Sequence, residues 1–274
     1  MYSRVYVEIT NICNMHCSFC HGHSRAPRQM TEEEYARVLS QLSGKTQYIY
    51  HHLMGEPLIH PLLPRFIEMA REAGFHPMLT TNGTLLDRVG DAILIPGLHK
   101  VNISLHSFEE DGQDAHKRYI EKIAEFAQKA NRAGVLISLR LWNNGCDGGR
   151  NKIAIETLRE NLPGQWSENT RGYRIRDGLF LEWGERFSWP DQNAPDTGDS
   201  LFCYGLKDHF GILSDGTVVP CCLDSDGVIA LGNVFREELS DILASPRAKA
   251  MVEGFRRRKA TEDLCRRCGY ARKF

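Results

Sequence analysis

Three cysteines lie close together near the N-terminus, in the stretch ITNICNMHCSFCHGH at 9–23. Cys13, Cys17 and Cys20 have the spacing C-x3-C-x2-C. Thiols at such short intervals are typical of metal ligands, and a cubane iron–sulfur cluster needs one thiolate for each of its four irons. Three cysteines therefore predict a cluster with one iron open to another ligand. A structural zinc site is the alternative, because a nearby histidine could supply a fourth ligand.

Four cysteines near the C-terminus form a second set. Cys203 and Cys221 are spaced C-x17-C, and Cys265 and Cys268 form C-x2-C after a long gap. Four thiolates match four irons, so a cubane bound by this set would have no open iron and would serve in electron transfer. The alternative is a structural zinc ribbon built from the same four residues.

The composition limits the class of protein. The chain has 274 residues, is 42% hydrophobic and 25% charged, and has a formal net charge of -1. These values are typical of globular domains and argue against a general nucleic-acid-binding surface. No apolar run reaches the ~18 residues that a membrane span needs, and the N-terminus lacks the pattern of a signal peptide. We therefore expect a cytoplasmic protein that binds neither nucleic acid nor a membrane.

Hydrophobic periodicity predicts the elements that position these cysteines. Helical spacing predicts helices at 30–42, 63–74 and 114–134, the first of them capped by Thr31. Strands that alternate with helices form right-handed βαβ units. We therefore expect an α/β fold, a partial (β/α)6 TIM-like barrel, over residues 1–190. The six predicted strands are 4–10, 46–54, 75–82, 100–107, 136–143 and 178–187.

The composition changes after the last of these strands. The stretch 188–200 is rich in Pro, Asp and Gly and is typical of a linker. Beyond it, the sequence predicts a hairpin over 211–222 and a helix over 238–259 that breaks at Pro246. These elements predict a small C-terminal α+β domain at 191–274.

The cysteine pattern resembles a known family. The C-x3-C-x2-C run follows the first strand, at the edge of the sheet where such folds carry their chemistry. With Phe19 just before the third cysteine, it resembles the radical S-adenosylmethionine superfamily. That resemblance implies a [4Fe-4S] cluster whose open iron binds S-adenosyl-L-methionine, which electron transfer cleaves to a 5'-deoxyadenosyl radical. The second cysteine set resembles the twitch domain, a shortened SPASM domain, which implies a second [4Fe-4S] cluster ligated by cysteines alone.

Further motifs fit the same resemblance. MGEP at 54–57 resembles the Gly-Gly-Glu motif of the family, with Met in place of the first glycine, and implies that Gly55 and Glu56 receive the ammonium group of the cofactor. The resemblance also implies that Ser104 and Arg140 hold its carboxylate or ribose, with Asn82 nearby. Phe19 would contact the cofactor from the cysteine run. The alternative is that Glu56, Asn82 and Ser104 are ordinary turn or strand-end residues. A charge within LISLRLWN needs a partner or a polar cavity.

Two cysteines lie outside both sets. Cys146 lies in the glycine-rich stretch NNGCDGG, and Cys222 directly follows Cys221. A free cysteine is most often an inert buried thiol. The alternative comes from the resemblance, because a cysteine returns a hydrogen atom to the substrate radical in epimerases of this superfamily. Both residues are therefore candidate catalytic residues.

The leading hypothesis is a two-electron oxidation of a substrate, as in the aminoglycoside-pathway dehydrogenases of this superfamily. Its substrate radical would lose an electron to the auxiliary cluster and a proton to a base. Alternatives are epimerisation, peptide modification, or a zinc-stabilised binding module without activity. The implied partners are a small-molecule or peptide substrate and an external one-electron donor such as flavodoxin or ferredoxin, and since the chain begins directly at its first strand we expect no leader-binding module. The candidate bases are Asp147, Glu182, Glu185 and Asp191.

Overall fold

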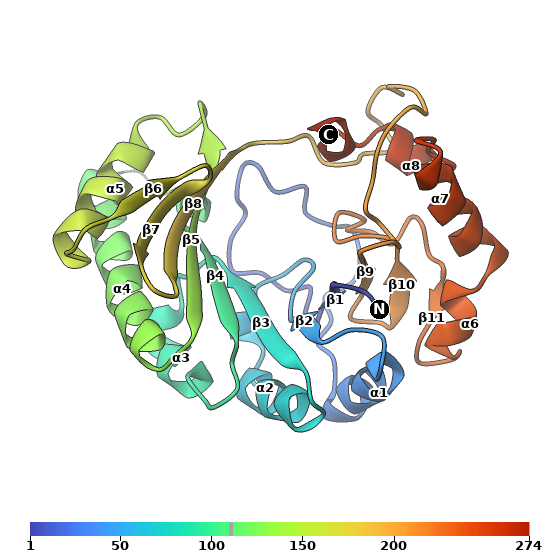
Figure 1. Cartoon of the computed structure of the whole chain (residues 1–274), viewed down its shortest axis with the longest axis horizontal. Coiled ribbons are helices and arrows are strands. Elements are labelled where there is room, and N and C mark those ends of the chain that lie inside the picture. The colour runs from blue at the N-terminus through green and yellow to red at the C-terminus, as the bar shows by residue number, and fades with distance from the viewer. Residues whose placement is uncertain (110–111, 274) are drawn as a thin grey trace.

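A single curved sheet organises the chain. The computed structural model describes residues 1–109 and 112–273. Within these residues, eleven strands pair in the order β11-β10-β9-β1-β2-β3-β4-β5-β8-β7-β6. Six of the parallel strands form an open barrel with helices on its outer face (Figure 1). These six are β1 (Arg4–Val7), β2 (Tyr48–Tyr50), β3 (His76–Thr81), β4 (Lys100–Ser104), β5 (Leu136–Asn144) and β8 (Leu179–Glu185).

The expected α/β partial barrel is confirmed, and each of the six predicted strands has its counterpart. The helices that follow the strands are α1 (Glu32–Leu42), α2 (Leu63–Glu72), α3 (Leu86–Ile93), α4 (Gln113–Arg132) and α5 (Arg150–Asn161). Thr31 caps α1 in a capping box with Glu34, as the sequence predicts. Prediction missed α3, α5 and the antiparallel strands β6 (Ser167–Asn169) and β7 (Gly172–Arg176).

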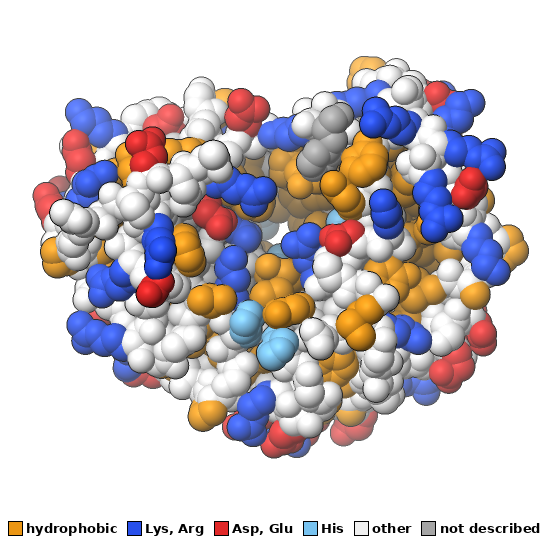
Figure 2. All heavy atoms as spheres, in the orientation of Figure 1, with side chains coloured by type: hydrophobic (Ala, Val, Ile, Leu, Met, Phe, Trp, Pro, Cys, Tyr) orange, Lys and Arg blue, Asp and Glu red, His pale blue; other side chains and the backbone are white. Residues whose placement is uncertain are grey.

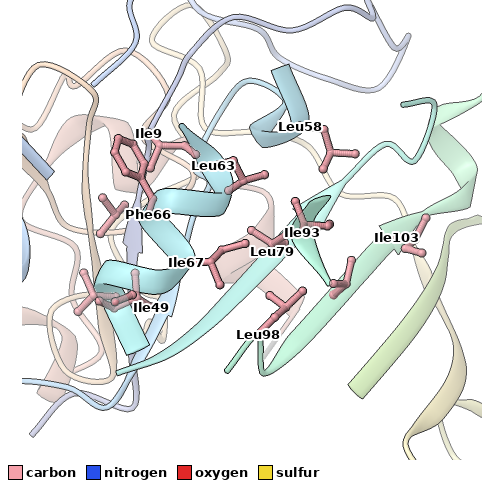
Figure 3. Packing of buried hydrophobic residues seen from close by; sticks show 14 of the residues in the cluster. Ile9, Ile49, Leu58, Leu63, Phe66, Ile67, Leu79, Ile93, Leu98 and Ile103 are labelled. Carbon is pink, nitrogen blue, oxygen red and sulfur yellow. The ribbon is translucent and has the colours of Figure 1, made fainter. Parts of the chain in front are cut away.

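Alternate side chains of the strands face opposite sides of the sheet. Val5 and Val7 are fully buried in the core between the sheet and the helices. Figure 3 shows the same core around α2, where Phe66 and Ile67 pack near Leu79 of β3. The intervening residue Tyr6 therefore points to the inner side of the barrel, where its ring stacks on a tyrosine of β2. The inner side is polar and is the side on which strand residues can meet a ligand.

The C-terminal elements extend the same sheet. Strand β9 (His209–Ile212) pairs in parallel with β1, and the hairpin continues through β10 (Thr217–Val219) to β11 (Gly232–Asn233). The helix predicted over 238–259 is two helices, α6 (Leu239–Leu243) and α7 (Pro246–Arg256), because Pro246 begins the second. The chain closes with α8 (Asp263–Arg266) and a short 3-10 turn at Tyr270–Lys273.

The predicted linker at 188–200 is irregular in structure and carries the chain from β8 to the C-terminal elements. The face in Figure 2 is hollowed between the barrel strands and these elements, with Lys and Arg side chains near the rim. No helix in the part of the chain that the structure describes is long and apolar enough to cross a membrane.

Candidate cluster and cofactor site

The three N-terminal cysteines lie in the loop between β1 and α1, at the carboxyl ends of the barrel strands. Cys13 and Cys20 are exposed and Cys17 is half-buried. The thiol of Cys17 lies 3.5 Å from the carbonyl oxygen of Ser107, just beyond β4. Burial, and then the two other thiols, raise the pKa of Cys17 to about 11. The three thiols are thus close enough to interact electrostatically.

The cysteine loop fits an iron–sulfur cluster. In the described residues, no three His, Cys, Asp or Glu side chains converge on a point where they could bind one metal ion. The thiolates of a cubane each bind a different iron, so they need to surround a cluster and not a single ion. Burial, then Glu56 and the Cys20 thiol, raise the pKa of Cys13 as well, and a bound cation would oppose this shift by stabilising the thiolate.

Gly55 lies where the loop after β2 meets the loop after β1. Its φ of +76° is in the left-handed region, which favours glycine. A Cβ at this position would overlap the carbonyl oxygen of Thr10 and lie 2.9 Å from the carbonyl carbon of Asn11. The glycine therefore permits the Gly-Glu segment to pack directly against the backbone that leads to the cysteines.

Glu56 is fully buried and binds the ends of two strands together. Its carboxylate accepts hydrogen bonds from the Thr81 hydroxyl at 2.7 Å, the Asn82 amide at 2.7 Å and the Leu58 amide at 3.0 Å. A carboxylate has about four acceptor positions, so one stays open for a further donor. The structure thus gives Glu56 a local structural role that the sequence left as the alternative, together with capacity for one more donor.

Asn82 contacts the cysteine loop directly. Its side-chain amide donates to the Asn14 side chain at 2.9 Å and lies 4.0 Å from the sulfur of Cys13. Its side-chain oxygen accepts from Thr84, and the Tyr119 hydroxyl donates to its carbonyl oxygen. The structure therefore brings this predicted residue to the cysteines.

Ser104, the last residue of β4, is the register partner of Arg140 in the middle of β5. The Arg140 guanidinium lies over the Trp142 ring at 4.5 Å, and its Nε lies 3.7 Å from an oxygen of Glu182 on β8. Burial lowers the pKa of Arg140, and its buried Nε makes no hydrogen bond within the described residues. The charge predicted to need a partner thus has an acidic and an aromatic one, and it keeps one free donor.

An aromatic row connects the cysteine loop to this arginine. The rings of Phe19 and His106 lie 4.8 Å apart, and those of His106 and Trp142 lie nearly parallel at 6.5 Å. Trp142 is 39% exposed, which is unusual for so large an apolar side chain beside a buried charge. Sequence reasoning missed Trp142, although its place two residues after Arg140 puts it on the same face of the strand.

The C-terminal cysteines come together from three separate segments. All four are half-buried, and Cys203 interacts electrostatically with Cys221, Cys265 and Cys268. Burial is the largest cause of the raised pKa at each of them. Four thiols gathered in this way fit a fully ligated cluster.

Cys222 faces the inner side of the barrel. Its thiol shares a hydrogen bond with the Tyr6 hydroxyl, and burial raises its pKa to about 11. It also packs in a small apolar cluster with Trp189, whose indole Nε1 donates to the carbonyl oxygen of Phe19 at 3.0 Å. The apolar cluster against which Cys222 packs therefore also contacts a residue that reaches the N-terminal cysteine loop.

Cys146 occupies a different place, in the turn after β5. It is exposed and lines a narrow cleft together with His106, Asp147 and Arg186. The cleft is at the carboxyl end of the strands, where the sequence predicts this cysteine. The two candidate thiols are thus in separate surroundings.

Family comparisons agree with this geometry. The family model described as Radical SAM superfamily matches residues 7–142, and the SPASM model, an iron-sulfur cluster-binding domain, matches residues 203–269. A probable GTP 3',8-cyclase of Methanococcus vannielii is 30% identical over 287 residues, covering 85% of this chain and 89% of the relative. The chain belongs to the radical SAM superfamily.

Other relatives align over shorter stretches. The GTP 3',8-cyclase of Chlorobaculum tepidum is 33% identical over 112 residues, which cover 39% of this chain and 34% of that protein. A probable GTP 3',8-cyclase of Methanothermobacter marburgensis is 30% identical over 137 residues, which cover 47% of this chain and 44% of that protein. This radical SAM chain thus spans less than half the length of these two relatives.

Solved structures share the fold of this radical SAM protein. BtrN in complex with AdoMet and 2-DOIA superposes with a TM-score of 0.60 at 17% identity, covering 98% of this chain and 93% of BtrN. BtrN is 2-deoxy-scyllo-inosamine dehydrogenase, and its layout matches the one expected from this sequence. A structure of anSMEcpe with bound AdoMet and a peptide superposes with a TM-score of 0.63 at 15% identity, covering 98% of this chain and 88% of anSMEcpe. At these identities the likeness concerns the fold alone.

The ionisation of Glu56 should make stability depend on pH. Burial raises the pKa of Glu56 to about 7, against hydrogen bonds that lower it, whereas an unfolded glutamate titrates near ~4.3. Between these values the folded state binds more protons, so this contribution to stability is complete below about pH 4.3 and is lost as the pH rises to about 7. The difference in free energy of unfolding between the native chain and Glu56→Gln should fall across this window in urea titrations. A difference independent of pH would contradict the burial argument.

Proposed function

We propose that this radical SAM protein is an oxidoreductase of the dehydrogenase type with two [4Fe-4S] clusters. The observation that supports this most is that both cysteine sets border the inner side of one barrel. The first set reaches Ser107, and in the second Cys221 is followed directly by Cys222, whose thiol bonds to Tyr6. When bound at these sites, S-adenosyl-L-methionine and its cluster would supply a 5'-deoxyadenosyl radical, and a cluster at the auxiliary cysteines would supply a one-electron acceptor. The substrate loses a hydrogen atom to the radical, then an electron and a proton, for a net two-electron oxidation.

The proposed metal ligands follow the two sets. Cys13, Cys17 and Cys20 hold the cluster with the open iron. This assignment leaves the auxiliary cluster fully ligated and unable to bind a substrate through iron. Its four proposed ligands are Cys203, Cys221, Cys265 and Cys268.

The proposed cofactor contacts lie around the cysteine loop. Glu56 has an acceptor position for the ammonium group, and Gly55 lets the backbone beside it come close. Arg140 has a free Nε for a carboxylate or a ribose hydroxyl, and Ser104 and Asn82 lie at the neighbouring strand ends. The ring of Phe19, in its row with His106, would pack against the cofactor.

Glu182 is the best placed of the candidate bases. It lies on the inner side of β8, beside Arg140. The other three acids are less suitable. Asp191 accepts a hydrogen bond from the Asn193 amide in the linker, and Asp147 accepts one from the Asn151 amide at the start of α5. The side chain of Glu185 is 80% exposed. We therefore propose that Glu182 accepts the proton that leaves the oxidised carbon or its hydroxyl.

The substrate is proposed to be a small molecule or a peptide. The GTP 3',8-cyclases among the relatives make GTP one substrate to test, and the peptide-bound neighbour makes a cysteine-containing peptide another. A cytoplasmic flavodoxin or ferredoxin is the proposed electron donor.

Epimerisation is a second candidate, supported by the position of Cys222. A thiol on the inner side of the barrel could return a hydrogen atom to the substrate radical from the face opposite to abstraction. The hydroxyl of Tyr6 would orient that thiol. Cys146 is less suited to this role, because it is exposed in a cleft beyond the strand ends.

Turnover in deuterated water distinguishes the two candidates. Oxidation predicts a product with two hydrogens fewer and one 5'-deoxyadenosine for each product. The Cys222→Ala variant should still form the oxidised product and 5'-deoxyadenosine. Epimerisation predicts one deuterium gained at an inverted carbon and loss of that product in Cys222→Ala, with Cys146→Ala as the matched control. The panel of substrates includes sugars, GTP and peptides, and a deuterated product of unchanged oxidation level would exclude the dehydrogenase proposal.

A further inference from the structure

A buried glutamate directly after β1 connects three distant segments. Glu8 has no exposed surface and accepts five hydrogen bonds. Two come from Arg25 at 2.7 Å each, one from the Met54 amide at 3.1 Å, and two from the Ser214 amide and hydroxyl at 3.1 and 2.9 Å. One carboxylate therefore joins the cysteine loop, the loop of the Gly-Glu motif and the C-terminal hairpin.

Arg25 extends this connection to the auxiliary cysteines. Its Nε donates to the carbonyl oxygen of Ser225 at 2.8 Å, and next to it the Ser24 amide and hydroxyl donate to Asp226 at 2.6 and 2.9 Å. These C-terminal residues follow Cys222 by only a few positions. The far end of the N-terminal cysteine loop is thus held by the segment that leaves the auxiliary cysteines.

The ion pair has a geometry that determines position. A guanidinium and a carboxylate joined by two parallel hydrogen bonds are fixed in direction as well as distance. Burial of a charged pair brings little net stability compared with apolar side chains of similar size. A gain in stability therefore does not account for the buried Glu8–Arg25 pair. A role in aligning the three segments does.

We propose that Glu8 and Arg25 are positioning residues that couple the two cysteine sites, so that an assembled auxiliary site orders the N-terminal cysteine loop for S-adenosylmethionine cleavage. The inference rests on the cluster roles proposed above for the two cysteine sets. Among the described residues neither side chain makes a hydrogen bond to a cysteine, so the effect passes through the loop backbone.

The first test replaces the arginine. Arg25→Lys keeps the charge but not the bidentate fork, and we expect amide exchange of 21–28 and 213–227 to become at least about tenfold faster. Reductive cleavage of S-adenosylmethionine should fall about tenfold or more, with iron content unchanged. Arg4→Met is the matched control, because the Arg4–Asp208 pair also joins β1 to the C-terminal part, at 2.9 Å, but does not reach the cysteine loop. Equal behaviour of the two variants would overturn the proposal.

The second test measures the coupling itself. A double variant, Cys265→Ala with Cys268→Ala, should have faster amide exchange at residues 21–28 than the native chain. The same double substitution should increase this exchange rate little when Arg25→Lys is already present. Additive effects would overturn the coupling. Amide exchange requires neither substrate nor turnover. A native chain that fails to cleave S-adenosylmethionine would therefore refute the proposed function, while the exchange data would still decide on the coupling.

Discussion

Alanine at Cys13, Cys17 and Cys20 together should abolish formation of 5'-deoxyadenosine from S-adenosylmethionine. Iron should fall from about eight to about four per chain, because one of two four-iron clusters loses its ligands. The three thiols lie together at the strand ends, beside Asn82 and Ser107, and the sequence offers no other trio with this spacing. Iron analysis and chromatography of the reaction products under strong reduction measure both effects.

The matched control is the auxiliary set. Alanine at Cys265 and Cys268 should also lower iron to about four, but the N-terminal cluster should still cleave S-adenosylmethionine at a measurable rate. Oxidation of a substrate should be lost in this variant, because the electron has no acceptor. Cleavage that survives in the triple variant and disappears in the auxiliary variant would reverse the assignment of the two sites.

Gly55→Ala should both unfold the chain more easily and abolish cleavage of S-adenosylmethionine. The left-handed φ alone costs about 1 to 2 kcal/mol for an alanine. The added Cβ would also overlap the backbone at Thr10 and Asn11, which must move at a cost of about 1 to 3 kcal/mol. Because that backbone leads to Cys13, the displacement would disturb the cluster loop as well as the fold.

Gly74→Ala separates the two causes. Gly74 ends α2 with a φ of +83°, but a Cβ there would meet no atom within 4 Å. We expect Gly74→Ala to retain cleavage and to be more stable than Gly55→Ala by about 2 kcal/mol in urea unfolding. Equal free energies of unfolding for the two variants would mean that the close approach at Thr10 has no energetic consequence.

The barrel could be predicted because its signals are local. Strands such as Arg4–Val7 alternate or are uniformly apolar, and the helices that were predicted after them carry a cap, as α1 does at Thr31, or a terminal glycine. The place of Cys13 at the strand ends then follows from topology. By contrast, β6 is exposed at every residue and has no apolar pattern, so its hairpin with β7 was missed.

The rest of the site depends on contacts between distant residues. Glu8 reads as an ordinary alternating residue of a strand, and its partners lie 17 residues away at Arg25 and 206 away at Ser214. The parallel pairing of β9 with β1 has the same character, because nothing in either segment specifies the other. Glu56 was predicted as a cofactor contact, while its three internal hydrogen bonds depend on how β2 and β3 end side by side. The division of the chain near residue 190 stays a prediction.

The most direct test of the account is made on the unsubstituted chain, reconstituted and kept without oxygen. The electron paramagnetic resonance spectrum of the reduced protein is recorded before and after S-adenosylmethionine is added, with iron, sulfide and 5'-deoxyadenosine measured on the same sample. The account predicts about eight irons, a spectrum in which only one of two cluster signals changes with the cofactor, and formation of 5'-deoxyadenosine. Two results would contradict the account and favour a metal-stabilised binding module. One is zinc in place of iron, and the other is two cluster signals that do not change with the cofactor, without cleavage of S-adenosylmethionine.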